Sequence, residues 1–130
     1  MRVYFITQKD YGISVILNPK IPESSPEYEG RIKRICVSTS ILGALSSIGN
    51  NLGLECNTYI YKCDLDKDEI IQPENNVNDI DMTGELWILT EKEFKLHKIV
   101  KLKQVQSFCV DKEKDIDIFN FKFEIIKEYI

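Results

Sequence analysis

The sequence predicts an α+β domain dominated by antiparallel strands, with one main helix. Three segments alternate apolar and polar residues with a period of two, which is typical of strands: residues 58–63, 85–90 and 116–123. One segment, residues 41–51, repeats its apolar residues at helical spacing. Strands therefore outnumber helices along the chain.

The composition favours one soluble domain over residues 1–130. The chain length suits a single core, and 43% hydrophobic with 29% charged residues is typical of a globular protein. No run approaches the roughly 20 apolar residues of a membrane span, and no signal-peptide pattern opens the chain. We therefore expect a cytoplasmic protein with no membrane association. The net charge of -4 argues against general nucleic-acid binding, which requires clustered Lys and Arg.

The four cysteines do not form a metal or disulfide pattern. They are scattered, without a Cys-x-x-Cys pair, and only one histidine accompanies them: Cys36, Cys56, Cys63 and Cys109. We predict that they are reduced and free.

The first seven residues predict a central strand. Val3 and Phe5 lie on one face of that strand, and Tyr4 and Ile6 lie on the other. Both faces are apolar enough to be covered, which is typical of a strand inside a sheet.

A turn and a long loop follow this strand. Asp10-Tyr11-Gly12 predicts the turn, and residues 13–17 predict a second short strand. Residues 18–30 contain three of the four prolines and predict a loop, because proline cannot donate to a ladder. A loop of this length is often a lid or a binding loop.

Three hydroxyls mark the junction between a strand and the predicted helix. Cys36 and Val37 favour a strand, and the helical pattern begins just after Ser38, Thr39 and Ser40. Hydroxyls there can cap the first amides of the helix, where an anionic group is also favoured. The junction is either part of a phosphate or nucleotide site or an ordinary helix start.

The C-terminal half predicts further strands. The helix should stop at residues 50–53, and strands should follow at residues 58–63, 85–90 and, with a bulge, 94–105. After the strand at 116–123, residues 124–130 either form a helical turn or continue it. We expect one contiguous core cluster, made of Val37, Ala44, Leu45, Ile48, Ile60, Trp87 and Leu89.

Few residues suggest chemistry on their own. The acidic run at residues 64–68 resembles the start of a calcium loop, but the sixth and twelfth positions are Glu69 and Asn75 instead of Gly and Glu. His97 has no partner that spacing can name, so we expect a surface or half-buried strand residue. Glu85 opens a hydrophobic strand directly after a Thr-Gly turn and close to Trp87. It is either a solubilising edge residue or a carboxylate that stabilises a cationic transition state.

The order of these segments resembles the ADP-ribosyltransferase superfamily, most closely the small rifamycin ADP-ribosyltransferases and related phage or bacterial proteins. The resemblance covers residues 1–102 at the level of degenerate motifs. Tyr4-Phe5-Ile6-Thr7 matches the first motif, and Pro19-Lys20-Ile21-Pro22 matches the proline loop. Residues 34–44 match the hydroxyl junction, and residues 57–61 match the strand after the helix.

This resemblance implies a cleft that binds NAD between two small curved sheets. It assigns NAD binding to residues of the first motif and the junction: Tyr4, Thr7, Ser38, Thr39 and Ser40. It makes Glu85 the acid that stabilises the oxocarbenium ion while nicotinamide leaves. Phe5 stands where the family has histidine. Either Arg2 or Tyr4 therefore takes over its contact with ribose, or the site does not bind NAD catalytically.

Two functions follow from the resemblance, and a third stands apart from it. The chain is an NAD-dependent ADP-ribosyltransferase acting on an acceptor protein, nucleic acid or small molecule, or it is an inactive member of the fold. The inactive form would bind a protein or a nucleotide, for example as a phage or bacterial inhibitor, and would meet a protein through Tyr4 and Trp87. The third alternative is a nuclease-like or inhibitor protein unrelated to NAD.

Overall fold

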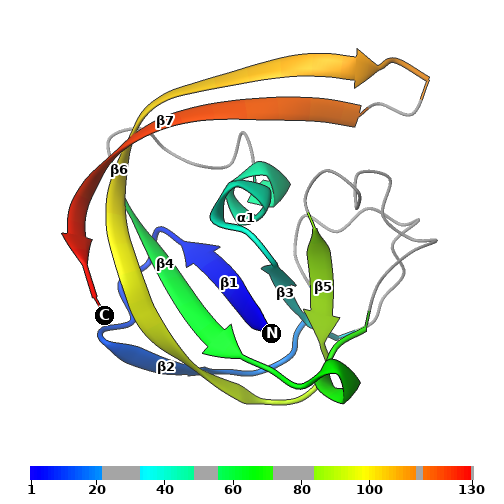
Figure 1. Ribbon diagram of the computed structural model, residues 1–130, viewed down its shortest axis with the longest axis vertical. Helices are drawn as coiled ribbons and strands as arrows, with labels where there is room; N and C mark the ends of the chain where they lie inside the picture. The colour runs from blue at the N-terminus through cyan, green and yellow to red at the C-terminus, as the bar shows by residue number, and fades with distance from the viewer. Residues whose placement is uncertain (22–32, 49–55, 72–83, 114–115, 130) are drawn as a thin grey trace.

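The computed structural model describes residues 1–21, 33–48, 56–71, 84–113 and 116–129. Its strands form one antiparallel sheet in the order β2-β6-β4-β1-β3-β5, and β7 pairs with β6 (Figure 1). The elements are β1 (Arg2–Thr7), β2 (Ser14–Leu17), β3 (Ile35–Ser38), α1 (Ile41–Ile48), β4 (Asn57–Asp64), the 3-10 turn η3 (Lys67–Glu69), β5 (Glu85–Ile88), β6 (Lys92–Asp111) and β7 (Ile116–Glu128).

The predicted α+β class, with an antiparallel sheet and one helix, is confirmed. The expected division into two sheets is wrong for the described residues. They form a single sheet, because β1 pairs with β4 on one edge and with β3 on the other. The second connection passes through one residue pair, Tyr4 and Ser38, so this pair joins β3 and β5 to the other strands. The central position predicted for β1 is confirmed.

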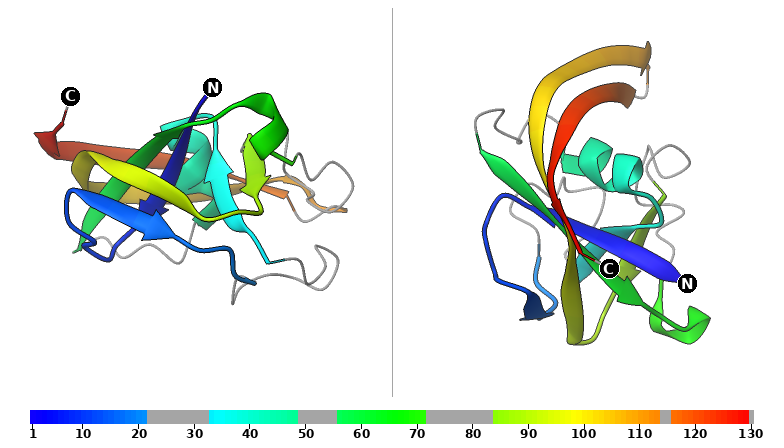
Figure 2. Two further views of the ribbon diagram at one scale, coloured as in Figure 1. Left: turned by 90° about the horizontal axis from the view of Figure 1, so that it is seen from below. Right: turned by 60° about the vertical axis from the view of Figure 1, so that its left-hand side comes forward.

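The sheet has a buried apolar cluster on each face. The first cluster draws residues from all six strands of the main order, so the sheet curls around it (Figures 1 and 2). Its buried members are Val3, Ile35, Val37, Tyr61, Leu65, Ile88, Phe94 and Leu96. The second cluster lies between α1 and the sheet and consists of Ile6, Ala44, Leu45, Ile60, Val100 and Leu102. We call it the helix-side cluster.

The prediction of one contiguous core cluster is wrong. Val37 belongs to the first cluster, whereas Ala44, Leu45 and Ile60 belong to the helix-side cluster. The reason is the alternation of strand side chains between the two faces of a sheet. Leu89 is 41% exposed because β5 ends one residue before it. Trp87 is buried as predicted, and the side chain of Ile48 lies outside the described set.

The remaining element predictions have mixed outcomes. α1 begins at Ile41 as predicted, while its predicted continuation to residue 51 and the stop at 50–53 lie outside the described residues. The bulge predicted in β6 is confirmed by a register shift opposite Ile60 and Tyr61. The last segment continues β7 to Glu128 instead of forming a helical turn. The β6–β7 hairpin passes over α1, where Phe121 packs against the helix-side cluster (Figure 1).

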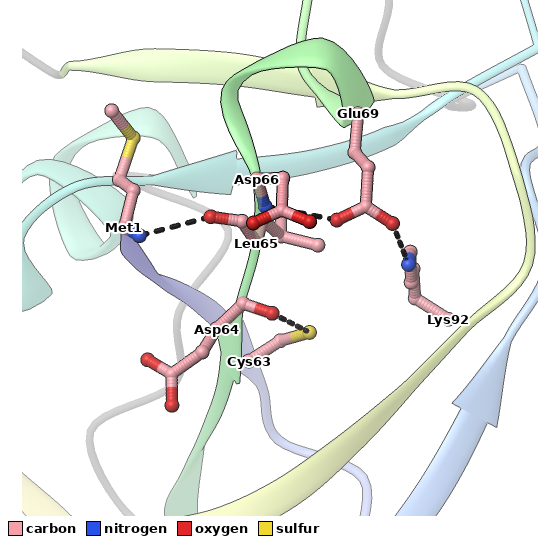
Figure 3. A network of polar contacts seen from close by, with 7 residues as sticks. All are labelled: Met1, Cys63, Asp64, Leu65, Asp66, Glu69 and Lys92. Atoms are coloured by element: carbon pink, nitrogen blue, oxygen red, sulfur yellow. Dashed lines mark hydrogen bonds and ion pairs between the residues drawn. The ribbon is translucent and has the colours of Figure 1, made fainter.

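A polar network ties the N-terminus to the segment after β4 (Figure 3). The Met1 ammonium donates to the Leu65 carbonyl oxygen at 2.9 Å, and the Asp66 amide donates to Glu69 Oε2 at 2.9 Å. Glu69 also pairs with Lys92, which lowers the pKa of the glutamate. The acidic run is thus held by protein groups. No cluster of three metal-ligating side chains occurs in the described part of the chain.

Two further observations concern the described residues alone. None of their helices has both the length and the apolar character needed to cross a membrane. Cys36, Cys56 and Cys63 form no disulfide, as predicted, and the side chain of Cys109 lies outside the described set. Burial raises the pKa of Cys63.

Candidate functional site

Six residues, one from each neighbouring strand, lie opposite one another in register across the sheet. Each pair of neighbours is a cross-strand pair, and such partners project from the same face. In spatial order from β5 to β2 this polar row is Glu85, Ser38, Tyr4, Lys62, Lys95 and Ser14. An acid therefore stands near one end, hydroxyls follow, and two lysines stand near the other end.

The polar row runs beside α1. Tyr4 and Ile41 both pack against the helix-side cluster, so the row lies at the start of the helix. The junction hydroxyls hold this start in place: Ser40 Oγ accepts the Gly43 amide at 3.0 Å, and Ser38 Oγ accepts the Ser40 amide at 3.3 Å. The predicted capping role is thus confirmed for Ser40.

Glu85 is held by the indole of Trp87. Trp87 Nε1–H donates to Glu85 Oε2 at 3.0 Å, and both side chains lie on the same face of β5. The Arg34 guanidinium carbon lies 4.1 Å from the Trp87 ring centroid, and both residues are buried. This stack fixes the orientation of the carboxylate. It also hides Trp87, which is 1% exposed, so the expectation that Trp87 meets a partner is wrong.

Thr39 contacts the turn that leads into Glu85. Its amide donates to the Gly84 carbonyl oxygen at 3.3 Å. Gly84 has φ +63°, and a Cβ at that position would lie 2.6 Å from Thr39 Oγ1. Glycine therefore lets the junction and the start of β5 approach one another.

Replacing Gly84 by Ala should test this close approach. We expect a loss of roughly 2 to 4 kcal/mol in unfolding free energy, because left-handed backbone strain and the Thr39 contact act together. Gly12 is the matched control, since it has φ +85° and open space around its Cβ position. Gly12→Ala should cost only about 1 kcal/mol, the backbone part alone. Equal losses in a urea titration would contradict the steric argument, and Thr39→Ala in the Gly84→Ala background should recover part of the loss.

The structure separates the residues of the first motif. Tyr4 belongs to the polar row, whereas Phe5 points to the other face and packs near Phe94, with ring centroids 6.1 Å apart. Tyr4, and not Phe5, is therefore the motif residue beside Ser38. Thr7 pairs with Tyr59 at the far end of β1, and its Oγ1 accepts the Lys9 amide. The structure does not bring Thr7 to the row.

Sequence reasoning missed the basic end of the row. Lys62 and Lys95 are direct cross-strand partners, and His97 follows two residues later at the bulge of β6. The His97 ring lies 5.8 Å from the Tyr4 ring, which places both on the same face. Strand pairing adds Lys62 and Tyr4 to this end of the row, although both are far from His97 in the chain.

His97 lies in a positive environment. Burial lowers its pKa from the ordinary value of 6.5, and Lys62, Lys98 and Arg2 lower it further, while Glu128 opposes them. Its Nδ1 atom is buried and has no hydrogen-bond partner in the described part of the chain. The imidazole is consequently neutral at neutral pH.

This lowered pKa predicts an acid-sensitive stability. Below about pH 6.5 the unfolded chain binds a proton at His97 while the folded chain does not, so stability should fall as the pH falls. His97→Gln should flatten the dependence of the urea midpoint between about pH 7.5 and 5.5, a range in which His97, the only histidine, titrates when unfolded. An unchanged slope in the variant would show that His97 is not responsible.

The proline loop starts close to this site. Lys20 and Arg34 exchange two backbone hydrogen bonds, of 2.9 and 3.1 Å, which attach the start of the loop to β3. Residues 22–30 of the predicted loop lie outside the described residues.

Comparison of the chain with family models, curated proteins and solved structures finds no match. The site is therefore interpreted from its own geometry. That geometry brings together three of the six predicted site residues, Tyr4, Ser38 and Glu85, with Thr39 and Ser40 next to them at the helix start.

Proposed function

We propose that the protein binds NAD along the polar row and transfers ADP-ribose to an acceptor. The observation that carries the proposal is the placement of Tyr4, Ser38 and Glu85 side by side on three adjacent strands. In the family that the sequence resembles, the first motif, the hydroxyl junction and the acid act together. The acceptor is a protein or a small molecule, and the reaction belongs in the cytosol.

Cleavage of NAD requires a negative charge next to the cation that develops on the ribose. The bond between the ribose C1′ and the nicotinamide nitrogen breaks, and its electron pair leaves with the neutral nicotinamide. Glu85 stabilises the oxocarbenium ion that forms, and the acceptor then bonds to C1′ and releases its proton. Trp87 contributes by fixing Glu85 Oε2 before the reaction, because a preorganised charge needs no reorientation in the transition state.

Tyr4 is suited to hold the ribose, and Ser38 supports it from the neighbouring strand. The Tyr4 hydroxyl can donate to and accept from sugar hydroxyls, and Tyr4 lies between Glu85 and the lysines. Ser38 is nearly fully buried, and Tyr4 is half-buried against the helix-side cluster. Such side chains lose little freedom when a ligand binds.

Incubation of the purified protein with NAD tests this function. Chromatography should detect released nicotinamide, and calorimetry should detect NAD binding. Binding without release would favour the inactive, nucleotide-binding member of the fold. If the protein neither bound NAD nor released nicotinamide, NAD would be excluded. A protein partner would then remain as the ligand.

A further inference from the structure

We propose that Lys62, Lys95 and His97 form a binding site for a diphosphate group. The inference goes beyond NAD cleavage, because it concerns the basic end of the polar row and applies to any ligand that carries a diphosphate.

Two like charges lie directly opposite each other at this end of the row. Lys62 on β4 and Lys95 on β6 are cross-strand partners in register, an arrangement that destabilises a sheet when both side chains are charged. No ion pair involves either lysine within the ranges that the structure describes, whereas Arg2 pairs with Asp64 and Lys98 with Glu128. An anion between the two ammonium groups would turn this repulsion into attraction.

His97 lies at a bulge next to these lysines. The bulge of β6 gives this strand one residue more than β4, and His97 is that extra residue. Bulges re-aim side chains and are frequent beside binding sites. Here the bulge places the ring near Tyr4 with Nδ1 buried and without a partner among the described residues. Because Nδ1 is covered, a phosphate oxygen would contact the half-buried imidazole through its other nitrogen, Nε2.

The spacing along the row matches the length of a dinucleotide. Neighbouring strands lie about 4.8 Å apart, so the three steps from Glu85 to Lys62 span roughly 14 Å. A dinucleotide laid along the row would thus place its sugar near Tyr4 and Ser38 and its diphosphate near the lysines. A diphosphate on another ligand would occupy the same lysines without reaching Glu85.

Binding of inorganic pyrophosphate, measured by calorimetry at low salt, tests the site. We expect the Lys62→Gln/Lys95→Gln variant to bind at least about tenfold more weakly than the unmodified protein. The control is Lys9→Gln. Lys9 is exposed and follows the C-terminal end of β1, outside the polar row, so this variant should bind pyrophosphate normally. Equal affinities in all three proteins, or equal losses in both variants, would overturn the proposal.

Measurements of stability show whether a lysine substitution weakens binding by destabilising the fold. Removing one of two opposed lysines relieves repulsion, so Lys95→Gln should unfold at the same or a higher urea concentration than the unmodified protein. A clearly lower midpoint would mean that the lysines stabilise the fold, and would overturn the argument from repulsion.

A competition experiment identifies the source of the diphosphate. If NAD places its own diphosphate on the lysines, pyrophosphate should weaken NAD binding. If a separate phosphorylated ligand uses them, the two should bind together. Pyrophosphate binding in a protein that neither binds nor cleaves NAD would support this site while rejecting the transferase proposal. NAD cleavage by a protein that binds no pyrophosphate would support the transferase proposal while rejecting this site.

Discussion

Replacing Glu85 by Gln is expected to lower NAD cleavage by about two or more orders of magnitude. The amide keeps the size of the side chain but loses the negative charge that stabilises the oxocarbenium ion. Trp87 Nε1–H can still donate to the oxygen of the new side-chain amide, so the fold and the NAD affinity should be retained. The rate of nicotinamide release is the measurement, with NAD affinity measured in parallel.

A nearby acid serves as the control for this substitution. Glu91 is exposed and follows β5, outside the polar row, so Glu91→Gln should cleave NAD at the unmodified rate. If Glu85→Gln and Glu91→Gln were equally active, Glu85 would not be the acid of the reaction. If both lost activity to the same degree, a change in overall charge would explain the result.

The second large effect concerns the attachment of α1 to the sheet. Leu45 is fully buried in the helix-side cluster, so Leu45→Ala should lower the free energy of unfolding by about 2 to 5 kcal/mol. The cost has two parts, the lost transfer of the side chain out of water and the cavity left between α1 and the sheet. The urea midpoint, at an unchanged slope, reports this loss.

The same helix provides a control for this loss. Leu42 is 54% exposed, so Leu42→Ala makes the same chemical change without leaving a cavity. It should change the free energy of unfolding by about 0.5 kcal/mol or less. Similar losses for the two leucines would contradict the orientation of α1. Since α1 begins beside the polar row, Leu45→Ala should also weaken ligand binding more than Leu42→Ala does.

Local pattern was sufficient for much of the fold. Period-two alternation located β4, β5 and β7, and it put Tyr4 and Phe5 on opposite faces of β1. The hydroxyl junction placed the start of α1, because capping depends on residues next to one another in the chain. These features share a physical basis: each depends on backbone preference or on neighbours within one turn.

Local pattern was not sufficient for the core. Apolar residues were correctly identified as buried in most positions, but they were assigned to one cluster instead of two. Val37 and Ile60 lie on opposite faces because of the register of their strands, which the order of apolar residues does not specify. Leu89 differs for another reason, since β5 ends at Ile88 and leaves the next side chain exposed.

The order of residues specifies an acid at the start of a strand, hydroxyls before a helix, and alternating lysines and histidine in another strand. It does not specify that Glu85, Ser38, Tyr4, Lys62 and Lys95 form one row, which depends on strand pairing. Hydrogen bonds between strands join segments that are far apart in the chain. The partner of a strand is selected by the packing of the whole sheet, and no local periodicity carries that choice.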